Sequence, residues 1–159
     1  MTEKGFEKTV MEYSDMVYRI SLNICRDPED SQDVMQNVFM RYLRKGDSLK
    51  SEEHKKAWLI RVTINESRRI FSSGEKSDCV PIEEVAETLR FEENSSAELF
   101  AEVMKLPEKY RTVIYLYYYE GYAVKDIAGI LRIPSATVRT RLSRGRESLR
   151  CILKEDYYD

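Results

Sequence analysis

Hydrophobic residues recur every three or four positions along most of this chain, which is the spacing of one face of an α-helix. They cluster in two blocks, roughly Phe6–Phe71 and Ala97–Leu153, with a more polar stretch between them. Runs that alternate in the β pattern are scarce. The pattern therefore predicts an all-α protein of two small helical domains, residues 1–71 and 97–159, joined by a flexible linker at 72–96.

The first block predicts three helices, over Phe6–Cys25, Pro28–Arg44 and Glu52–Phe71. Asp27 before Pro28 is typical of an N-cap followed by proline at the first helical position. Gly46 is expected to end the second helix. The apolar stripe of the second helix is expected to pack inward through Val34, Val38 and either Tyr42 or Phe39.

The second and third predicted helices carry polar faces of different charge. The face of the second helix opposite its apolar stripe holds Asp30, Asp33, Gln36, Asn37 and Arg41. The third helix is basic outside its expected core side of Trp58, Leu59, Val62 and Ile70, through Lys55, Lys56, Arg61, Arg68 and Arg69. Trp58 also fits a stacking platform for an unpaired base, but its Leu and Val neighbours favour the core.

The second block predicts a helix over Glu98–Lys105, a new helix that starts at Pro107, and a close at Gly121 in the left-handed conformation. An unusual run of aromatic residues ends this helix and continues just beyond Gly121: Tyr115, Tyr117, Tyr118, Tyr119 and Tyr122. Tyrosines at consecutive helical positions point in several directions. Some are therefore expected in the core, and others on the surface, where they suit a protein partner.

The segment Tyr122–Cys151 has the pattern of a helix-turn-helix. Ile127, Ala128 and Leu131 share one face of a short helix, and Pro134 interrupts the helical ladder. Ser135 is a suitable N-cap for the following helix. That helix keeps one apolar stripe through Val138, Leu142, Leu149 and Leu153, and Gly145 in the same stripe permits close approach of a neighbouring backbone.

The charge of this segment differs from that of the whole chain. Between Val124 and Cys151 there are seven basic and two acidic residues, although the chain has a formal net charge of −2. Arginines that flank an apolar stripe suit DNA phosphates and guanine edges. Snorkelling arginines on a solvated helix are the alternative interpretation. Agreement of turn, cap, stripe and charge favours DNA binding.

The predicted linker is acidic, through Glu83, Glu84, Glu87, Glu92 and Glu93. Because this segment precedes a basic one, we hypothesise that it competes with DNA for the recognition helix in the free protein.

Composition excludes several classes of function. The N-terminal MTEKGFEKTV lacks the apolar core of a signal peptide, and no apolar run is long enough for a membrane span, so a cytoplasmic protein without membrane insertion is expected. Three separated cysteines, Cys25, Cys79 and Cys151, do not have the spacing of a disulfide framework or a zinc site. One histidine, His54, in a solvated run, gives no catalytic constellation, and there is no glycine-rich phosphate loop. No catalytic residue, metal or cofactor is predicted.

Three segments together resemble the sigma-70 family of RNA polymerase sigma factors, in its extracytoplasmic-function (ECF) group. The family's fourth region is similar to LPEKYRTVIYLYYYEGYAVKDIAGILRIPSATVRTRLSRGRESLR. The segment of its second region that binds the clamp helices of the polymerase β′ subunit is similar to DPEDSQDVMQNVFMRYLRK. The segment that melts and recognises the minus-ten element is similar to KAWLIRVTINESRR.

This resemblance implies a promoter-specificity subunit rather than an enzyme. Its implied partners are core RNA polymerase, at the β′ clamp helices and the β flap, promoter DNA, and an anti-sigma factor. Implied polymerase-binding residues are Asp30, Asp33, Gln36 and Asn37. Implied contacts to the melted non-template strand are Arg61, Asn65, Arg68 and Arg69. Implied contacts of the recognition helix with the minus-thirty-five element are Ser135, Thr137, Arg139, Thr140, Ser143 and Arg144.

The chain departs from the family pattern at three places. Arg132 replaces the glycine common in the turn, so either this residue is not left-handed or it bears strain. Ala123 stands where a serine or threonine cap is common. Glu66-Ser67-Arg68-Arg69 lacks the usual apolar and aspartate pattern after Asn65.

Two rival functions remain open on the sequence. A stand-alone DNA-binding regulator explains the second block and leaves the first without a role. A module that sequesters another protein through the tyrosine run and the acidic linker leaves the arginines without a role.

Overall fold

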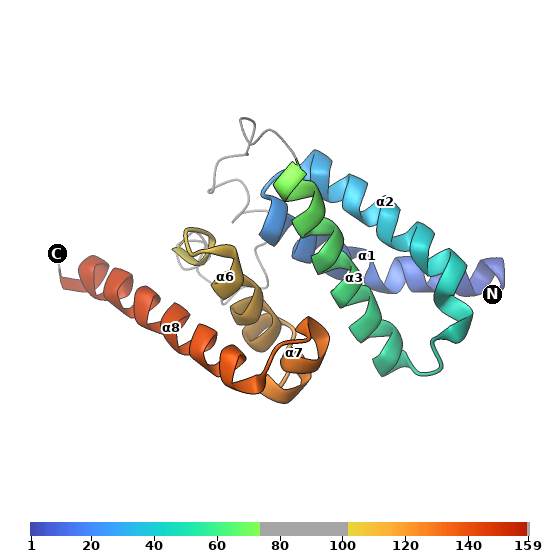
Figure 1. The fold of residues 1–159 in the computed structure, drawn as a ribbon. Coiled ribbons are helices and arrows are strands. Elements are labelled where there is room, and N and C mark those ends of the chain that lie inside the picture. The colour runs from blue at the N-terminus through green and yellow to red at the C-terminus, as the bar shows by residue number, and fades with distance from the viewer. Residues whose placement is uncertain (74–101, 159) are drawn as a thin grey trace. The chain divides into compact units, whose positions relative to one another are not determined.

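The structure is a computed structural model that describes residues 1–73 and 102–158, with no side chain described at 73 or from 151 onward. The chain divides into two compact units, Met1–Val80 and Pro81–Asp159 (Figure 1). The described residues form helices and no strand, so the all-α prediction is confirmed. The hypothesis about the acidic linker concerns residues outside the described ones.

The N-terminal unit is built from α1 (Glu3–Cys25), α2 (Pro28–Lys45), the short 3₁₀ helix η1 (Gly46–Ser48) and α3 (Glu52–Ser73). Each of the three long helices packs against the other two. Their shared core is apolar and closed to solvent at Val17, Ile24, Val34, Leu59 and Ile60. Burial of these stripes, rather than helix propensity, stabilises such a bundle.

The ends of the N-terminal helices follow capping chemistry. Asp27 is the N-cap of α2, as predicted, and its side chain accepts a hydrogen bond from the Glu29 amide at 3.1 Å. Gly46 follows the last residue of α2, but it keeps right-handed helical angles and leads into η1. Arg26 closes α1 in the left-handed conformation, with φ of 56°.

The predicted core of this unit is largely confirmed. Phe39 and Tyr42 both pack inward, so α2 uses both of the alternatives. Trp58 is 8% exposed and lies 6.3 Å from the Tyr42 ring, which places it in the core. The expectation for α3 was wrong at Val62 and Ile70, which are half-buried, since α3 instead buries Ile60 and Ile64.

The C-terminal unit contains α6 (Glu108–Ile114), the π-helix η3 (Tyr115–Tyr119), α7 (Val124–Leu131) and α8 (Ser135–Tyr158). Helix α8 packs on both α6 and α7. Its core includes Val113, Leu116, Ile127, Val138 and Leu142. This arrangement is the helix-turn-helix expected from the sequence, with α7 as the first helix and α8 as the second.

Gly145 permits a close approach, but the neighbour is a side chain. A Cβ built at Gly145 would lie 2.6 Å from Cδ1 of Ile114 on α6. The glycine therefore lets α8 and α6 pack closely around Ile114.

Three local expectations in this unit need correction. The carbonyl of Pro134 accepts from the amides of Thr137 and Val138, so Pro134 is the cap and Ser135 is the first helical residue. Leu131, expected on the same face as Ile127 and Ala128, is only half-buried, whereas Ile130 is buried. The helix after Pro107 does not run through Tyr117 as an α-helix, because a π-helix begins at Tyr115.

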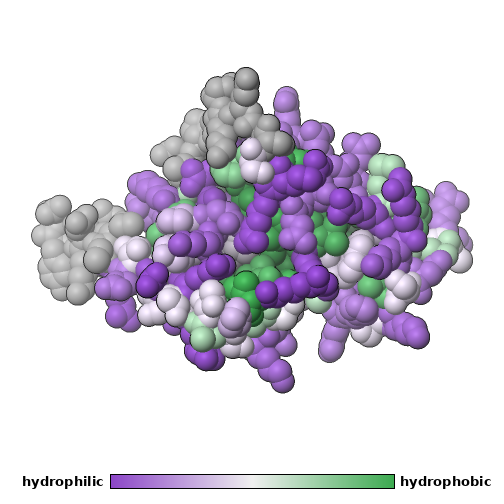
Figure 2. All heavy atoms as spheres, in the orientation of Figure 1, coloured by the Kyte–Doolittle hydropathy of each residue, from purple (hydrophilic) through white to green (hydrophobic). Residues whose placement is uncertain are grey.

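Gly121 has φ of 73° and closes this segment in the left-handed conformation, as predicted. The surface drawn in Figure 2 is mainly hydrophilic, with smaller hydrophobic areas between the charged side chains. Within 1–73 and 102–158, no helix is long and apolar enough to cross a membrane.

Candidate nucleic-acid and polymerase interfaces

Helix α3 brings the residues predicted to contact the melted strand onto one side. Asn65 follows Arg61 by four positions, and Arg68 and Arg69 follow Asn65 by three and four. Asn65 and Arg69 are exposed, whereas Arg61 and Arg68 are half-buried. Nε of Arg61 is buried and has no hydrogen-bond partner among the described residues. A buried donor of this kind is suited to an external acceptor such as a phosphate oxygen.

Glu66 lies beside this stripe and faces the core. Its side chain is only 2% exposed, yet it pairs with Arg41 of α2 at 2.5 Å and with Arg69 at 2.9 Å. Asn37 of α2 donates a further, longer hydrogen bond to it at 3.4 Å. The Glu66 carboxylate therefore joins three side chains: Asn37, a predicted polymerase-binding residue, Arg69, a predicted strand-binding residue, and Arg41.

These partners also set the ionisation of the cluster. Burial alone would raise the pKa of Glu66. The hydrogen bond from Arg69 and the charges of Arg41 and Arg69 outweigh burial, with help from Asn37, and hold the pKa of Glu66 below its usual value. The same contact raises the pKa of Arg69. Glu66 is therefore a buried anion at neutral pH.

The predicted polymerase-binding residues lie along α2, starting in its first turn. Asp33 and Gln36 are exposed, and Asp30 and Asn37 are half-buried. Burial raises the pKa of Asp30, and the nearby carboxylates of Asp27, Asp33 and Glu29 raise it further. Such a shift marks a concentration of negative charge. An acidic helical face of this kind favours a basic partner surface.

Buried and exposed residues lie on opposite faces of helix α8. Val138 and Leu142 face α6 and α7, and four of the predicted DNA contacts are exposed, namely Arg139, Thr140, Ser143 and Arg144. Ser135 and Thr137 are half-buried in the first turn. The hydroxyl of Thr140 donates to the Ala136 carbonyl at 2.9 Å, so it presents an acceptor and a methyl group outward. That face suits base edges and phosphates in a major groove.

The turn that orients α8 contains a strained residue. Arg132 has φ of 56° and ψ of 46°, so the left-handed alternative holds despite the absence of glycine. Ala123 occupies the N-cap of α7, and its side chain makes no capping hydrogen bond. The local cost of such positions is about 1 kcal/mol each. Burial of Ile127 and Ile130 against the rest of the unit offsets it.

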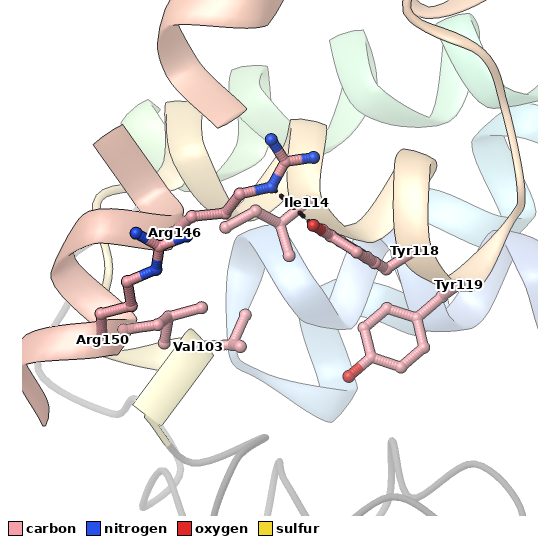
Figure 3. A pocket seen from close by; sticks show the side chains of 7 residues that line it. Val103, Ile114, Tyr118, Tyr119, Arg146 and Arg150 are labelled. Carbon is pink, nitrogen blue, oxygen red and sulfur yellow. Dashed lines mark hydrogen bonds between the residues drawn. The ribbon is translucent and has the colours of Figure 1, made fainter. Parts of the chain in front are cut away.

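The tyrosine run is divided between core and surface by the π-helix. Tyr115 is buried and stacks on Tyr119 with ring centres 5.6 Å apart, while Tyr118 is exposed. Nε of Arg146 donates to the Tyr118 hydroxyl at 2.6 Å, and its guanidinium lies 5.4 Å from the centre of the Tyr117 ring. Figure 3 shows Arg146 and Tyr118 at a mainly apolar cavity of about 450 Å³. The lining of this cavity includes Val103, Ile114, Tyr118, Tyr119, Arg146 and Arg150.

The sequence reasoning missed Glu66 and gave Arg41 no role of its own. A signal was present, because Glu66 falls in the same helical stripe as Leu59, Thr63 and Ile70. A carboxylate on an apolar stripe predicts a buried partner. Across the described ranges, no group of three His, Cys, Asp or Glu side chains is placed to hold a metal ion.

Each of the two units contains a segment that matches a known family model. Residues 9–76 match the family model described as sigma-70 region 2, and residues 96–149 match sigma-70, region 4. The ECF RNA polymerase sigma factor SigW of Bacillus subtilis is 31% identical over 96% of this chain and 91% of that protein. The ECF RNA polymerase sigma-E factor of Escherichia coli K12 is 27% identical over 92% of this chain and 85% of its own length.

Solved structures share the fold. CnrH in complex with the cytosolic domain of CnrY matches with a TM-score of 0.72 at 21% identity, over 98% of this chain and 91% of that chain. The sigma factor RpoE in complex with the anti-sigma factor NepR from Bartonella quintana matches with a TM-score of 0.71 at 20% identity, over 95% and 98%. Two family regions in order, and a relative similar along nearly its whole length, lead to one conclusion. The chain belongs to the sigma-70 family, and within it to the ECF RNA polymerase sigma factors, as the resemblance predicted.

Proposed function

We propose that this ECF sigma factor binds core RNA polymerase in the cytoplasm, directs it to a promoter and promotes strand opening, without catalysing a reaction itself. The division of labour is that of the predicted domains. Residues 1–71 bind the polymerase and the minus-ten element, residues 72–96 connect, and residues 97–159 bind the minus-thirty-five element. The observation that carries the proposal is the presence of both family regions, in order, in one short chain.

The α2 face is the proposed contact with the β′ clamp helices. Asp30, Asp33, Gln36 and Asn37 offer carboxylates and amides along one side of a rigid helix. Exposed charged groups of this kind determine orientation and association rate more than the bulk of the affinity. The β flap is the second proposed contact with the polymerase.

Helix α3 is the proposed holder of the melted non-template strand. Exposed Asn65 supplies donors and an acceptor for a base edge, and Arg61, Arg68 and Arg69 supply positive charge for the backbone. Trp58 is part of the core, which leaves base recognition to polar side chains on this helix.

Helix α8 is the proposed recognition helix for the minus-thirty-five element. Arg139 and Arg144 are exposed cations on either side of Thr140 and Ser143, and Ser135 and Thr137 lie in the turn that would enter the groove first. Arginine is suited to bidentate contact with guanine, and threonine to a thymine methyl group.

An anti-sigma factor is the proposed regulatory partner. One of the structural neighbours, RpoE, is in complex with an anti-sigma factor, and the other, CnrH, is in complex with the cytosolic domain of CnrY. We propose that such a partner covers the polymerase-binding surfaces of this chain until a signal releases it.

The test is assembly with core polymerase followed by run-off transcription on a genomic promoter library. The expected result is that the chain co-purifies with core polymerase and directs initiation from specific promoters. A stand-alone regulator would instead bind a duplex operator, usually as a dimer, and would not change the start sites used by core polymerase. That second result would overturn the proposal.

A further inference from the structure

The cluster around Glu66 combines two properties that seldom occur together. The carboxylate is 2% exposed, whereas its partners Arg41 and Arg69 are 52% and 61% exposed. Each guanidinium is thus held at one end by a fixed anion and presents the rest of its donors to solvent. Arginine has five N–H donors, and Glu66 contacts the Nη2 group of each.

Stability alone does not account for this arrangement. Replacement of a buried ion pair by apolar side chains of similar volume is often neutral or stabilising. At the position of Glu66, on a stripe shared with Leu59 and Ile70, an apolar residue would suit the core. What the carboxylate adds is geometry, because long arginine side chains otherwise lose considerable rotamer freedom when they are ordered at a binding site.

The position of the cluster connects it to the proposed strand-binding surface. Arg69 follows Asn65 by one helical turn on α3, and Arg41 approaches from α2 to the same carboxylate. Two guanidinium groups that share one carboxylate lie close to each other. Their two positive charges exceed the single negative charge of Glu66, so the cluster has a net positive charge on its exposed side.

We propose that Glu66 is a positioning residue that holds Arg41 and Arg69 as a pair of phosphate contacts for the single DNA strand bound by the N-terminal unit. This inference rests on the proposed function and adds two residues to it. Arg41 becomes a strand contact contributed by the polymerase-binding helix, and Glu66 acts through the two arginines without touching DNA. Asn37 connects the same carboxylate to the α2 face.

The direction in which Glu66→Gln changes the affinity for DNA distinguishes a positioning role from an effect of net charge. Glu66→Gln makes the unit more positive by one charge, which would tighten binding to DNA if net charge alone decided affinity. If Glu66 positions the arginines, the same substitution weakens binding, because the glutamine amide keeps only one acceptor oxygen for two guanidinium groups and places a donor against the other. Glu66→Asp keeps the charge and is expected to recover part of the affinity.

The experiment measures the binding of a fluorescein-labelled, mixed-sequence DNA single strand to the chain assembled with core polymerase, with core polymerase alone as the baseline. A salt titration accompanies each affinity. Arg41→Gln and Arg69→Gln are each expected to weaken binding about tenfold and to reduce the salt slope by about 0.7, the value for one phosphate contact to a single strand. Glu66→Gln is expected to weaken binding several-fold.

Lys4→Gln is the matched control, because it removes one exposed positive charge from the same unit at the start of α1. It is expected to change affinity less than about twofold. Circular dichroism melts accompany every variant. If Glu66→Gln does not fold, the two arginine variants decide the outcome, since both side chains are more than half exposed.

Equal or tighter binding by folded Glu66→Gln overturns the inference, as does an unchanged salt slope for Arg41→Gln. The inference is also overturned if core polymerase assembled with the wild-type chain binds the labelled DNA strand no more strongly than core polymerase alone. If the wild-type chain neither assembles with core polymerase nor directs specific initiation, the proposed function itself fails.

Discussion

The two units expose their cations in different ways. In the N-terminal unit, Arg41 and Arg69 are bound to a buried carboxylate that also contacts Asn37 of the neighbouring helix. In the C-terminal unit, Arg139 and Arg144 lie on the outer face of one helix, and the core residues Val138 and Leu142 lie on its other face.

The difference matters for what each unit does. A helix whose core and surface are separate can change its exposed residues without disturbing its packing, which suits recognition of different duplex sequences. A surface tied to a buried ion pair is fixed by two helices at once, which suits a strand that must be held in one geometry. The predictions below test this contrast, from the largest expected effect to the smallest.

Leu142→Ala is expected to have the largest effect, because Leu142 is 2% exposed between α8 and its neighbours. Loss of a fully buried leucine costs about 2–5 kcal/mol, a large part of the stability of a small domain. Hydrogen exchange resolved along the chain should show loss of protection in the C-terminal unit alone. Ser143→Ala, at the exposed neighbouring position, is the control, and equal loss of protection in both units would show that they do not fold independently.

Asp33→Lys is expected to weaken association with core polymerase by about 2 kcal/mol or more, since it places a positive charge against a basic partner. Binding of the isolated chain to duplex DNA should not fall. Surface-immobilised core polymerase measures the first quantity. Asp15→Lys makes the same change of charge at an exposed position of α1, and an equal loss in that variant would remove Asp33 from the interface.

Arg144→Ala is expected to produce the opposite pattern. A specific arginine contact with a base contributes about 1–3 kcal/mol, so binding to the upstream promoter element should fall while polymerase association persists. Lys109→Ala removes the same charge from α6 of the same unit and should leave affinity nearly unchanged. Loss of both activities in Arg144→Ala would show that Arg144 has a structural role.

Arg132→Gly is expected to raise the free energy of unfolding of the C-terminal unit by about 0.5 kcal/mol, because glycine adopts the left-handed angles without steric cost but loses more entropy on folding. Arg26 of the N-terminal unit also has φ of 56°, but its Nε is buried, so Arg26→Gly additionally removes buried side-chain contacts. Arg139→Gly, in the second turn of α8, should instead destabilise by about 1 kcal/mol. Chemical denaturation measures all three, and a destabilised Arg132→Gly would show that the Arg132 side chain has a stabilising contact.

The last effect is absent at neutral pH and is expected only at alkaline pH. Burial raises the pKa of Tyr119 from 10.0 to about 12. The unfolded chain therefore loses this proton near pH 10 while the folded unit keeps it, so stability falls as the pH rises from 10 towards 12. Tyr119→Phe should make the pH dependence of unfolding shallower in that range only.

Much of the fold followed from local patterns. The helices at Pro28 and Glu52, the cap at Asp27 and the left-handed Gly121 all depend on residues a few positions apart, and the structure has them as predicted. The π-helix at Tyr115 did not follow, because an aromatic run fits an α-helix equally well until its neighbours decide which rings are buried. Likewise, Arg132 could be assigned to either of two conformations until the packing of α7 and α8 fixed the turn.

By itself, the sequence determined the helices, the turn between α7 and α8, the basic face of α8 and the family resemblance, since each is carried by neighbours along the chain. Only the tertiary structure decided that Glu66 is a buried anion with Arg41 and Arg69 as its partners. Asn37 and Glu66 are 29 positions apart, and their contact exists only once α2 packs on α3. Helical periodicity records which side of a helix faces inward, but the partner that neutralises an inward charge is chosen by the helix packed against it.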